Sequence, residues 1–231
     1  MLDLARFTHL TFDCYGTLID WEVGILEAVM PVLRSHGVAA DETHILRSYA
    51  RHEAAEEAGS YRDYRAVLRG VVERFAEEHG FVATDSDREA LAASVGTWRP
   101  FPDTVDALRR LGTRYRLVIL SNVDDDIFQE TARLLRVPFE DVVTAQQVGS
   151  YKPALENFRF ALRRLGVPVG GILHVAQSLY HDHAPAKRLG LATARVNRAS
   201  RNPGTGVALP AEATPDLEVP DLESLASLAG V

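Results

Sequence analysis

The chain of 231 residues is poor in cysteine and lacks long apolar segments. Its single cysteine, Cys14, excludes an internal disulfide, which suits a reducing compartment. No apolar run approaches the ~18 residues of a membrane-spanning helix. The first residues lack the basic start and apolar stretch of a signal peptide. We therefore expect a cytoplasmic protein with no membrane contact.

Positive charge is also in deficit. Lys and Arg number 25 against 32 Asp and Glu, a net charge of −7. This balance argues against nucleic acid or an anionic membrane as a partner, and an anionic substrate would need cations placed close to it. The remaining composition, 46% hydrophobic over 231 residues, is enough for one sizeable core with an inserted subdomain.

Two sequence patterns alternate along the chain. Short apolar runs without helical period predict buried strands at 7–12, 117–120, 142–144, 172–176 and 192–196. Helical patterns, including 124–135 and 156–165, separate most of them. This alternation is typical of βαβ units, so we predict an α/β fold with a parallel sheet. The stretch 200–220, rich in Pro, Gly and Ala, predicts a surface loop.

The segment 21–97 contains no convincing strand. Its patterns predict four helices: 22–36, about 41–58, one from Tyr64 to a stop at Gly80, and one from Ser86 or Asp87 through Val95. Pro31 predicts a kink or a late start in the first helix. We expect these helices to form a cap over a core made of 1–20 and 98–231.

A polar motif follows the first predicted strand. The apolar run ends at Asp13 and continues as Cys14-Tyr15-Gly16-Thr17. A carboxylate at the carboxyl end of a buried strand faces the crevice where open α/β sheets bind ligands. The glycine allows backbone N–H groups to approach an anion. By itself, however, an Asp before a glycine turn is as often a simple turn residue.

Three more polar motifs lie further along the chain. Ser121-Asn122 follows the second strand, Lys152-Pro153 follows the third, and the stretch from Gln177 to Asp182 follows the fourth. Each has a simpler interpretation, such as a helix cap or a solvated lysine. Four polar motifs, each following a predicted strand, favour one shared site, because the carboxyl ends of parallel strands meet at one edge of a sheet.

These four polar motifs resemble motifs I to IV of the haloacid dehalogenase (HAD) superfamily. The resemblance covers essentially the whole chain, including a cap inserted after motif I. It implies a Rossmann-like core with Asp13 as nucleophile. The superfamily's phosphatases carry a second Asp where this chain has Tyr15, and another where it has Gln177. Asp-x-Tyr-Gly-Thr is the form found in 2-haloacid dehalogenases. Because Mg²⁺ prefers several anionic oxygen ligands, the two replacements predict no metal and no other cofactor.

The resemblance to L-2-haloacid dehalogenases implies a two-step hydrolysis of short 2-haloalkanoic acids. Asp13 would displace the halide, and water would then release a 2-hydroxy acid from the ester. Lys152 would keep Asp13 ionised, and Asp182 would orient Lys152 and help to activate water. We expect catalytic roles for Asp13, Lys152, Asp182 and Thr17. We expect substrate contacts from Cys14, Tyr15, Ser121, Asn122, Arg51, Gln177 and His181.

The chain departs from the dehalogenase pattern at three places. Motif IV of those enzymes reads Ser-x-Asn-x-x-Asp, where this chain has Gln177 and Leu179 before the Asp. They carry a Tyr six residues after the motif III Lys, where this chain has Phe158. They also place a cap Arg near the halide, for which Arg51 or Arg47 are loose matches.

These departures leave other interpretations open. His181 could assist the water step, although a packing histidine is commoner. Trp21, Tyr61 and Tyr64 could line a pocket or simply pack. One alternative is a HAD phosphatase that uses Asp13 as phosphoryl acceptor. Another is a HAD domain without catalysis that binds a small carboxylate or a partner protein. The resemblance also allows a homodimer, which no residue pattern indicates.

Overall fold

A computed structural model describes residues 2–200 and 209–231, and its centre is a parallel sheet. The six strands have the order β3-β2-β1-β4-β5-β6. They are β1 (His9–Phe12), β2 (Arg116–Ser121), β3 (Asp141–Thr144), β4 (Ile172–Ala176), β5 (Ala192–Val196) and β6 (Leu217–Val219). The predicted α/β fold with a parallel sheet is confirmed.

Five of the strands lie where the apolar runs predicted them. The sixth is a correction: β6 falls inside the predicted loop 200–220, where Leu217 pairs in register with Ala194 of β5. A three-residue edge strand is too short to produce an alternating pattern, so only its pairing partner reveals it. The part of that loop prediction at 201–208 lies outside the described residues.

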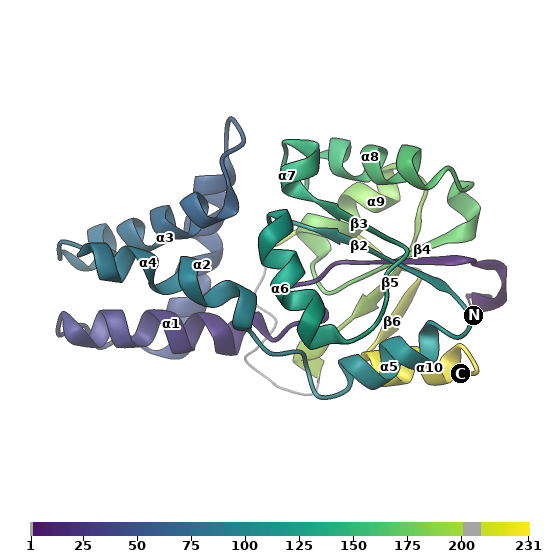
Figure 1. Cartoon of the computed structure of the whole chain (residues 1–231), viewed down its shortest axis with the longest axis horizontal. Coiled ribbons are helices and arrows are strands. Elements are labelled where there is room, and N and C mark those ends of the chain that lie inside the picture. The colour runs from purple at the N-terminus through teal and green to yellow at the C-terminus, as the bar shows by residue number, and fades with distance from the viewer. Residues whose placement is uncertain (1, 201–208) are drawn as a thin grey trace.

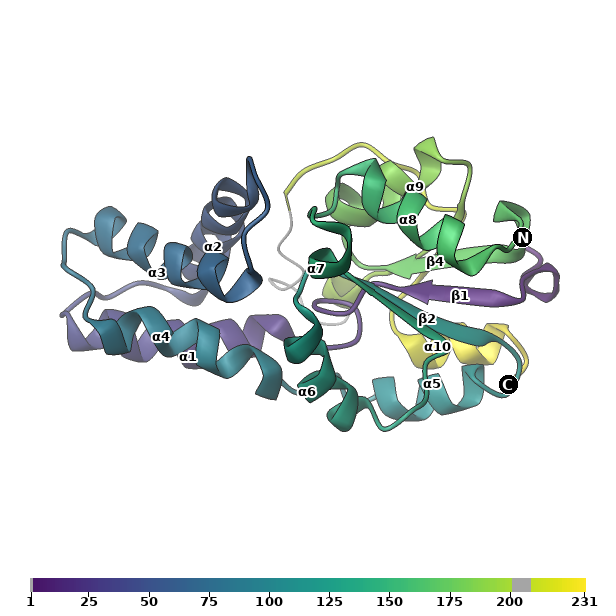
Figure 2. The same cartoon turned by 45° about the horizontal axis from the view of Figure 1, so that its top comes forward.

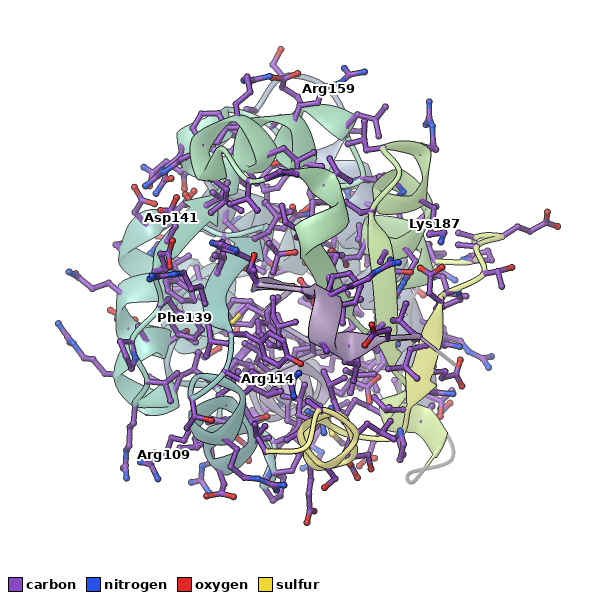
Figure 3. All side chains as sticks on the ribbon, turned by 90° about the vertical axis from the view of Figure 1, so that its right-hand side faces the viewer. Arg109, Arg114, Phe139, Asp141, Arg159 and Lys187 are labelled. Carbon is purple, nitrogen blue, oxygen red and sulfur yellow. The ribbon has the colours of Figure 1, made fainter. Side chains whose placement is uncertain are left out.

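Helices cover both faces of the sheet, which explains why the strands are nearly all apolar. On one side lie α7 (Ala145–Val148), α8 (Leu155–Leu165) and α9 (Ala184–Arg188), and on the other α5 (Thr104–Leu111), α6 (Asp125–Leu135) and α10 (Leu222–Leu228) (Figures 1 and 2). Figure 3 shows this arrangement from the end, with Arg159 of α8 and Arg109 of α5 projecting on opposite sides. Short 3₁₀ or π turns complete the core: η1 (Leu4–Arg6), η2 (Val95–Thr97), η3 (Val169–Gly171), η4 (Leu179–His183) and η5 (Arg198–Ser200).

Four helices stand apart from the sheet, beyond the carboxyl end of β1 (Figure 1). They are α1 (Trp21–Ser35), α2 (Glu42–Glu57), α3 (Tyr64–His79) and α4 (Asp85–Ser94). We refer to them as the cap. The buried apolar cluster continues from Phe12 of the sheet to Ile25, Tyr49 and Phe75 of the cap, so cap and core share one packed interior.

Local capping explains where the cap helices begin and end. Asp41 begins α2 as predicted, because its side chain accepts a hydrogen bond from His44 N at 2.9 Å. Gly80 ends α3 in the left-handed conformation, with φ of 73°. The start predicted for α4 at Ser86 or Asp87 is one or two residues late. Thr84 and Asp87 form a capping box there, so the helix begins at Asp85.

Pro31 lies inside the first cap helix, α1, and not at its start. α1 begins at Trp21, where Asp20 accepts a hydrogen bond from Val23 N, so the late start predicted from Pro31 is wrong. In the same helix, Gly24 lies directly under the ring of Trp98. Within the described part of the chain, no helix is long and apolar enough to cross a membrane.

Candidate active site

A small cavity of about 60 Å³ lies between the carboxyl edge of the sheet and the cap. The core contributes Asp13, Tyr15, Ser121, Asn122, Val123, Lys152, Gln177, Ser178, His181, Asp182 and Leu209 to its lining. The cap contributes Trp21, Ala50, Glu53, Glu57 and Tyr64. The structure therefore brings together residues of all four polar motifs.

Asp13 is held at the bottom of the cavity. It follows β1, is 8% exposed, and its Oδ2 accepts a hydrogen bond from Thr17 Oγ1 at 2.6 Å. Thr17 is held in turn by Gln177 N, which donates to Oγ1 at 2.9 Å. Gly16, with φ of 90°, makes the turn that folds Thr17 back onto Asp13. Burial raises the pKa of Asp13, and the neighbouring Lys152 ammonium opposes that rise.

Lys152 is a buried cation whose hydrogen bonds are all made inside the protein. It is 1% exposed, and Nζ donates to Asp13 Oδ1 at 2.8 Å, Asp182 Oδ1 at 2.7 Å and Leu120 O at 3.0 Å. Burial alone would lower the pKa of Lys152, but the two carboxylates raise it above its usual value. An ammonium has three N–H donors, so Lys152 keeps none for a substrate.

Asn122 holds the backbone of Lys152. Its Oδ1 accepts from Lys152 N at 2.7 Å, and its Nδ2 donates to Lys152 O at 3.0 Å. A longer contact of 3.4 Å joins Nδ2 to Glu57 Oε1. The residue lines the cavity, as expected of a substrate contact, but its polar atoms are directed to Lys152 and the cap.

Asp182 is the second carboxylate on Lys152. Its Oδ1 also accepts from His174 Nε2 at 3.1 Å, while its buried Oδ2 has no hydrogen-bond partner among the described residues. Burial would raise the pKa of Asp182, but Lys152 and His174 lower it well below its usual value. We did not predict His174. The sequence indicates this residue only as a histidine inside an apolar strand. In the structure, its Nδ1 is 2.9 Å from Thr11 Oγ1.

Two histidines follow β4 in η4, and only one faces the cavity. His181 lines it, with Nδ1 3.3 Å from Ser178 Oγ. Burial lowers the pKa of His181 to about 4, so its imidazole is neutral at pH 7. His183 is not part of the lining, and its Nε2 lies 2.9 Å from Ala176 O.

Tyr15 and Ser121 differ in what they offer a ligand. The Tyr15 hydroxyl is 2.7 Å from Thr131 Oγ1, and burial raises the pKa of this phenol well above its usual value. Ser121 is 2% exposed, and its Oγ has no hydrogen-bond partner among the described residues. Ser121 therefore offers a hydroxyl without a partner, whereas the Tyr15 hydroxyl already makes one hydrogen bond.

Cys14 does not reach the cavity. Its side chain is fully buried in the apolar cluster, and its carbonyl accepts from Leu18 N at 2.7 Å and Ile19 N at 3.0 Å. The structure therefore corrects the expected substrate contact, because the pleat of the chain after β1 turns Cys14 away from Asp13.

The expected cap arginine is a second correction. Arg51 is exposed, donates to Ser48 Oγ at 2.9 Å and pairs with Glu78 at 3.6 Å. Arg47 is also exposed, and neither arginine lines the cavity. The inner face of α2 instead carries Ala50, Glu53 and Glu57, at i, i+3 and i+7.

Glu53 and Glu57 are site residues that sequence reasoning missed. Glu53 is 9% exposed, and its Oε1 accepts from Tyr49 OH at 2.9 Å and Tyr64 OH at 2.5 Å. Burial raises the pKa of Glu53, and it raises that of Glu57 more strongly, with the nearby Glu53 charge adding to it. Nothing in the polar helix sequence distinguishes these two glutamates from solvated ones.

The residues around Asp13 do not fit a divalent cation. Tyr15 and Gln177 replace two carboxylates, and the Lys152 ammonium already lies between Asp13 and Asp182. In the described part of the chain, one set of three potential ligands converges within 4.8 Å: His44, Glu78 and His79, none of which lines the cavity.

Contacts between cap and core close the cavity. Asp124, which precedes α6, accepts from Tyr61 OH at 2.5 Å and from Tyr64 N at 2.7 Å. The core thus supplies a carboxylate to the first turn of α3, where unpaired N–H groups favour negative charge. Tyr151 OH adds a bond to Arg62 O at 2.8 Å.

Known proteins similar to this chain include both phosphatases and dehalogenases. The chain is 29% identical, over 97% of each protein, to the 5-amino-6-(5-phospho-D-ribitylamino)uracil phosphatase YigB of Escherichia coli. It is 31% identical to the glyceraldehyde 3-phosphate phosphatase of Methanocaldococcus jannaschii, but over 44% of this chain and only about half (46%) of that relative. The crystal structure of the L-2-haloacid dehalogenase PA0810 superposes with a TM-score of 0.79 and 25% identity, covering 97% of this chain and 100% of the other.

The sequence profile of the haloacid dehalogenase-like hydrolases matches residues 7–190, a span that runs from β1 through the cap to α9. Residues of all four polar motifs of the chain line one cavity beside the Asp13–Lys152–Asp182 cluster, and the superposition extends over the cap as well. The chain therefore belongs to the haloacid dehalogenase-like hydrolases and resembles the L-2-haloacid dehalogenases among them.

Proposed function

We propose that this hydrolase removes halide from short 2-haloacids without a metal ion, through an ester on Asp13. The observation that carries the proposal is the pairing of Asp13 with Lys152 Nζ at 2.8 Å, beside a Tyr15 hydroxyl bonded to Thr131. A phosphatase needs an acid near this position to protonate its leaving oxygen. A halide leaves without a proton, so the absence of a carboxyl group at position 15 matters less to a dehalogenase.

In the first step, an oxygen of Asp13 attacks the carbon that bears the halogen. A C–O bond forms, the carbon–halogen bond breaks, and the halide leaves with the bonding electrons. Lys152 supports this step by keeping Asp13 ionised in a buried site. Thr17 fixes the second carboxylate oxygen and so limits the rotation of the nucleophile.

In the second step, water attacks the carboxyl carbon of the Asp13 ester. The bond between that carbon and the alcohol oxygen then breaks, and the 2-hydroxy acid leaves with an oxygen from Asp13 and one proton of the water. The water oxygen restores the Asp13 carboxylate, and the second proton is released. The neutral imidazole of His181 can accept a proton of that water, and the unpaired Oδ2 of Asp182 can accept a hydrogen bond that orients the water.

The first test is halide release from a panel of 2-haloacids in EDTA, by wild type and Asp13→Asn. We expect release by wild type and at least ~10³-fold less by the variant. Asp106→Asn, a change of an exposed aspartate in α5, is the matched control and should keep full activity. A panel that yields no halide with wild type would reject the proposal for those substrates.

An isotope experiment tests the ester directly. In one turnover in H₂¹⁸O with excess enzyme, the product should contain ¹⁶O and the label should appear in Asp13. Label in the product of the first turnover would mean that water attacks the substrate itself, contrary to the proposal.

A phosphatase is the second candidate, supported by the likeness to YigB over nearly the whole chain. Hydrolysis of p-nitrophenyl phosphate that depends on both Mg²⁺ and Asp13, without halide release from 2-haloacids, would favour it. Stabilisation by a small carboxylate without any turnover would favour a binding role. The single cysteine supports the further proposal of a cytoplasmic location.

A further inference from the structure

The cavity contains more carboxylates than cations. Asp13, Asp182, Glu53 and Glu57 line it, and among its described lining residues Lys152 is the one permanent cation. All three N–H donors of Lys152 are used inside the protein. A substrate that is only anionic would meet this charge with no free ammonium to offset it. The carboxyl groups on the cap side of the cavity therefore need an explanation other than the binding of an anionic group.

Glu53 is a rigidly held acceptor. Two phenol hydroxyls, from Tyr49 and Tyr64, donate to its Oε1, and no hydrogen bond to Oε2 forms within the described part of the chain. These two hydrogen bonds favour the ionised form of Glu53 and so oppose the rise in its pKa that burial causes. The arrangement leaves one oxygen of a fixed carboxylate for a ligand in the cavity.

Glu57 lies one helical turn further along α2, on the same face. Among the described residues, its one hydrogen bond from the core is the 3.4 Å contact with Asn122 Nδ2. Asn122 makes two shorter bonds to Lys152, so it satisfies Glu57 poorly. Burial and the neighbouring Glu53 charge raise the pKa of Glu57, and an ammonium between the two carboxyl groups would oppose that rise and hold both ionised.

The core side of the same cavity offers the opposite kind of group. Ser121 Oγ is buried, without a partner among the described residues, and able to donate to a carboxylate. The cavity thus has a donor at the sheet edge and acceptors on the cap. A short molecule with an anionic end and a cationic end matches both.

We propose that Glu53 and Glu57 form a subsite for an ammonium group, and that the preferred substrates are short 2-haloacids that carry an amine. Such a zwitterion directs its carboxylate to Ser121 and its ammonium to α2, with the halogen-bearing carbon at Asp13. This inference rests on the proposed function for its chemistry but not for its binding.

The kinetic test compares 3-amino-2-chloropropanoate with 2-chlorobutanoate, in which a methyl group replaces the ammonium. We expect kcat/KM for the amine to exceed that of the isostere by about tenfold or more, mainly through KM. Glu53→Gln and Glu57→Gln should each reduce this preference about tenfold. Glu42→Gln, which neutralises an exposed glutamate at the start of α2, should leave it unchanged.

Three kinetic outcomes would overturn the inference. They are an equal preference for both substrates, an unchanged preference in both glutamine variants, and a loss of kcat for both substrates at constant KM in Glu57→Gln. The last would assign Glu57 to proton transfer instead of recognition. Circular dichroism and thermal melting of each variant would establish that it is folded.

An equilibrium test separates this inference from the proposed chemistry. Calorimetry would measure the binding of 3-aminopropanoate and of butanoate, neither of which carries a halogen. Binding of the first, weakened about tenfold or more by Glu53→Gln or Glu57→Gln, supports the subsite even if no halide is ever released. Equal affinity for the two compounds, or no binding of either, would reject the subsite whatever the enzyme does to haloacids.

Discussion

At the scale of single residues, the site depends on how Lys152 is held. A buried ammonium is stable only when its hydrogen bonds and charge are compensated. Two carboxylates and the Leu120 carbonyl do this for Nζ, and Asn122 fixes the backbone from which the side chain extends. Asn122 is therefore a positioning residue that acts through Lys152.

We predict that Asn122→Ala lowers kcat about 10- to 100-fold, because a displaced Lys152 no longer holds Asp13 ionised and oriented. The acid limb of the pH–rate profile should move to higher pH, since Asp13 would then need a higher pH to ionise. Steady-state kinetics from pH 5 to 9 on the most active haloacid would measure both effects. A rise in KM with unchanged kcat would instead support the direct substrate contact that the sequence suggested.

At the scale of elements, the cap depends on close packing between α1 and the segment that returns to the core. Trp98 follows η2 and lies against α1 at Gly24. A Cβ at Gly24 would be 2.3 Å from Trp98 Cγ, much closer than atoms can approach. Helix propensity by itself would favour alanine there by ~1 kcal/mol.

We predict that Gly24→Ala destabilises the protein by about 1–3 kcal/mol, because the overpacked Trp98 must move. Urea denaturation would measure the change. Gly70→Ala in α3 is the matched control, since its Cβ would meet the carboxylate end of Glu56, which pairs with Arg62 and Arg74, instead of a packed aromatic ring. Equal effects of the two substitutions would show that the contact with Trp98 is not the cause.

At the scale of the whole molecule, buried histidines link folding to pH. Burial lowers the pKa of both His181 and His183 to about 4, against about 6.5 in the unfolded chain. Between these values the unfolded state binds more protons, so acidification favours unfolding. The raised pKa values of Asp13, Glu53 and Glu57, caused by burial, act in the opposite direction.

We predict that the contribution of buried His183 to the free energy of unfolding falls as the pH is lowered from about 6.5 to about 4, by on the order of 3 kcal/mol. His183→Gln should reduce this slope, because glutamine keeps a donor near Ala176 O but does not titrate. Denaturation at pH 7 and pH 5 for both proteins would measure it. An unchanged slope in the variant would show that His183 does not contribute.

The sequence predicted the core of the molecule better than its cap. The five longer strands were readable because buried parallel strands are continuous apolar runs, and Asp13, Thr17, Lys152 and Asp182 were expected together because such strands end at one edge. The pattern analysis does not predict β6, because a strand of three residues is too short to show a periodic pattern. It wrongly directs the cap arginines to the cavity, because a mostly polar helix sequence does not indicate which face of the helix is buried.

The order of strands and polar residues by itself determined the family and the cluster around Asp13, since a parallel sheet brings its carboxyl ends together whatever the cap does. Only the tertiary structure decided what faces that cluster. Packing of α2 against α1 and α3 sets the rotation of the helix, which directs Glu53 and Glu57 inward and Arg47 and Arg51 to solvent. A rotation of about 100° per residue separates these outcomes, and no local sequence signal specifies it.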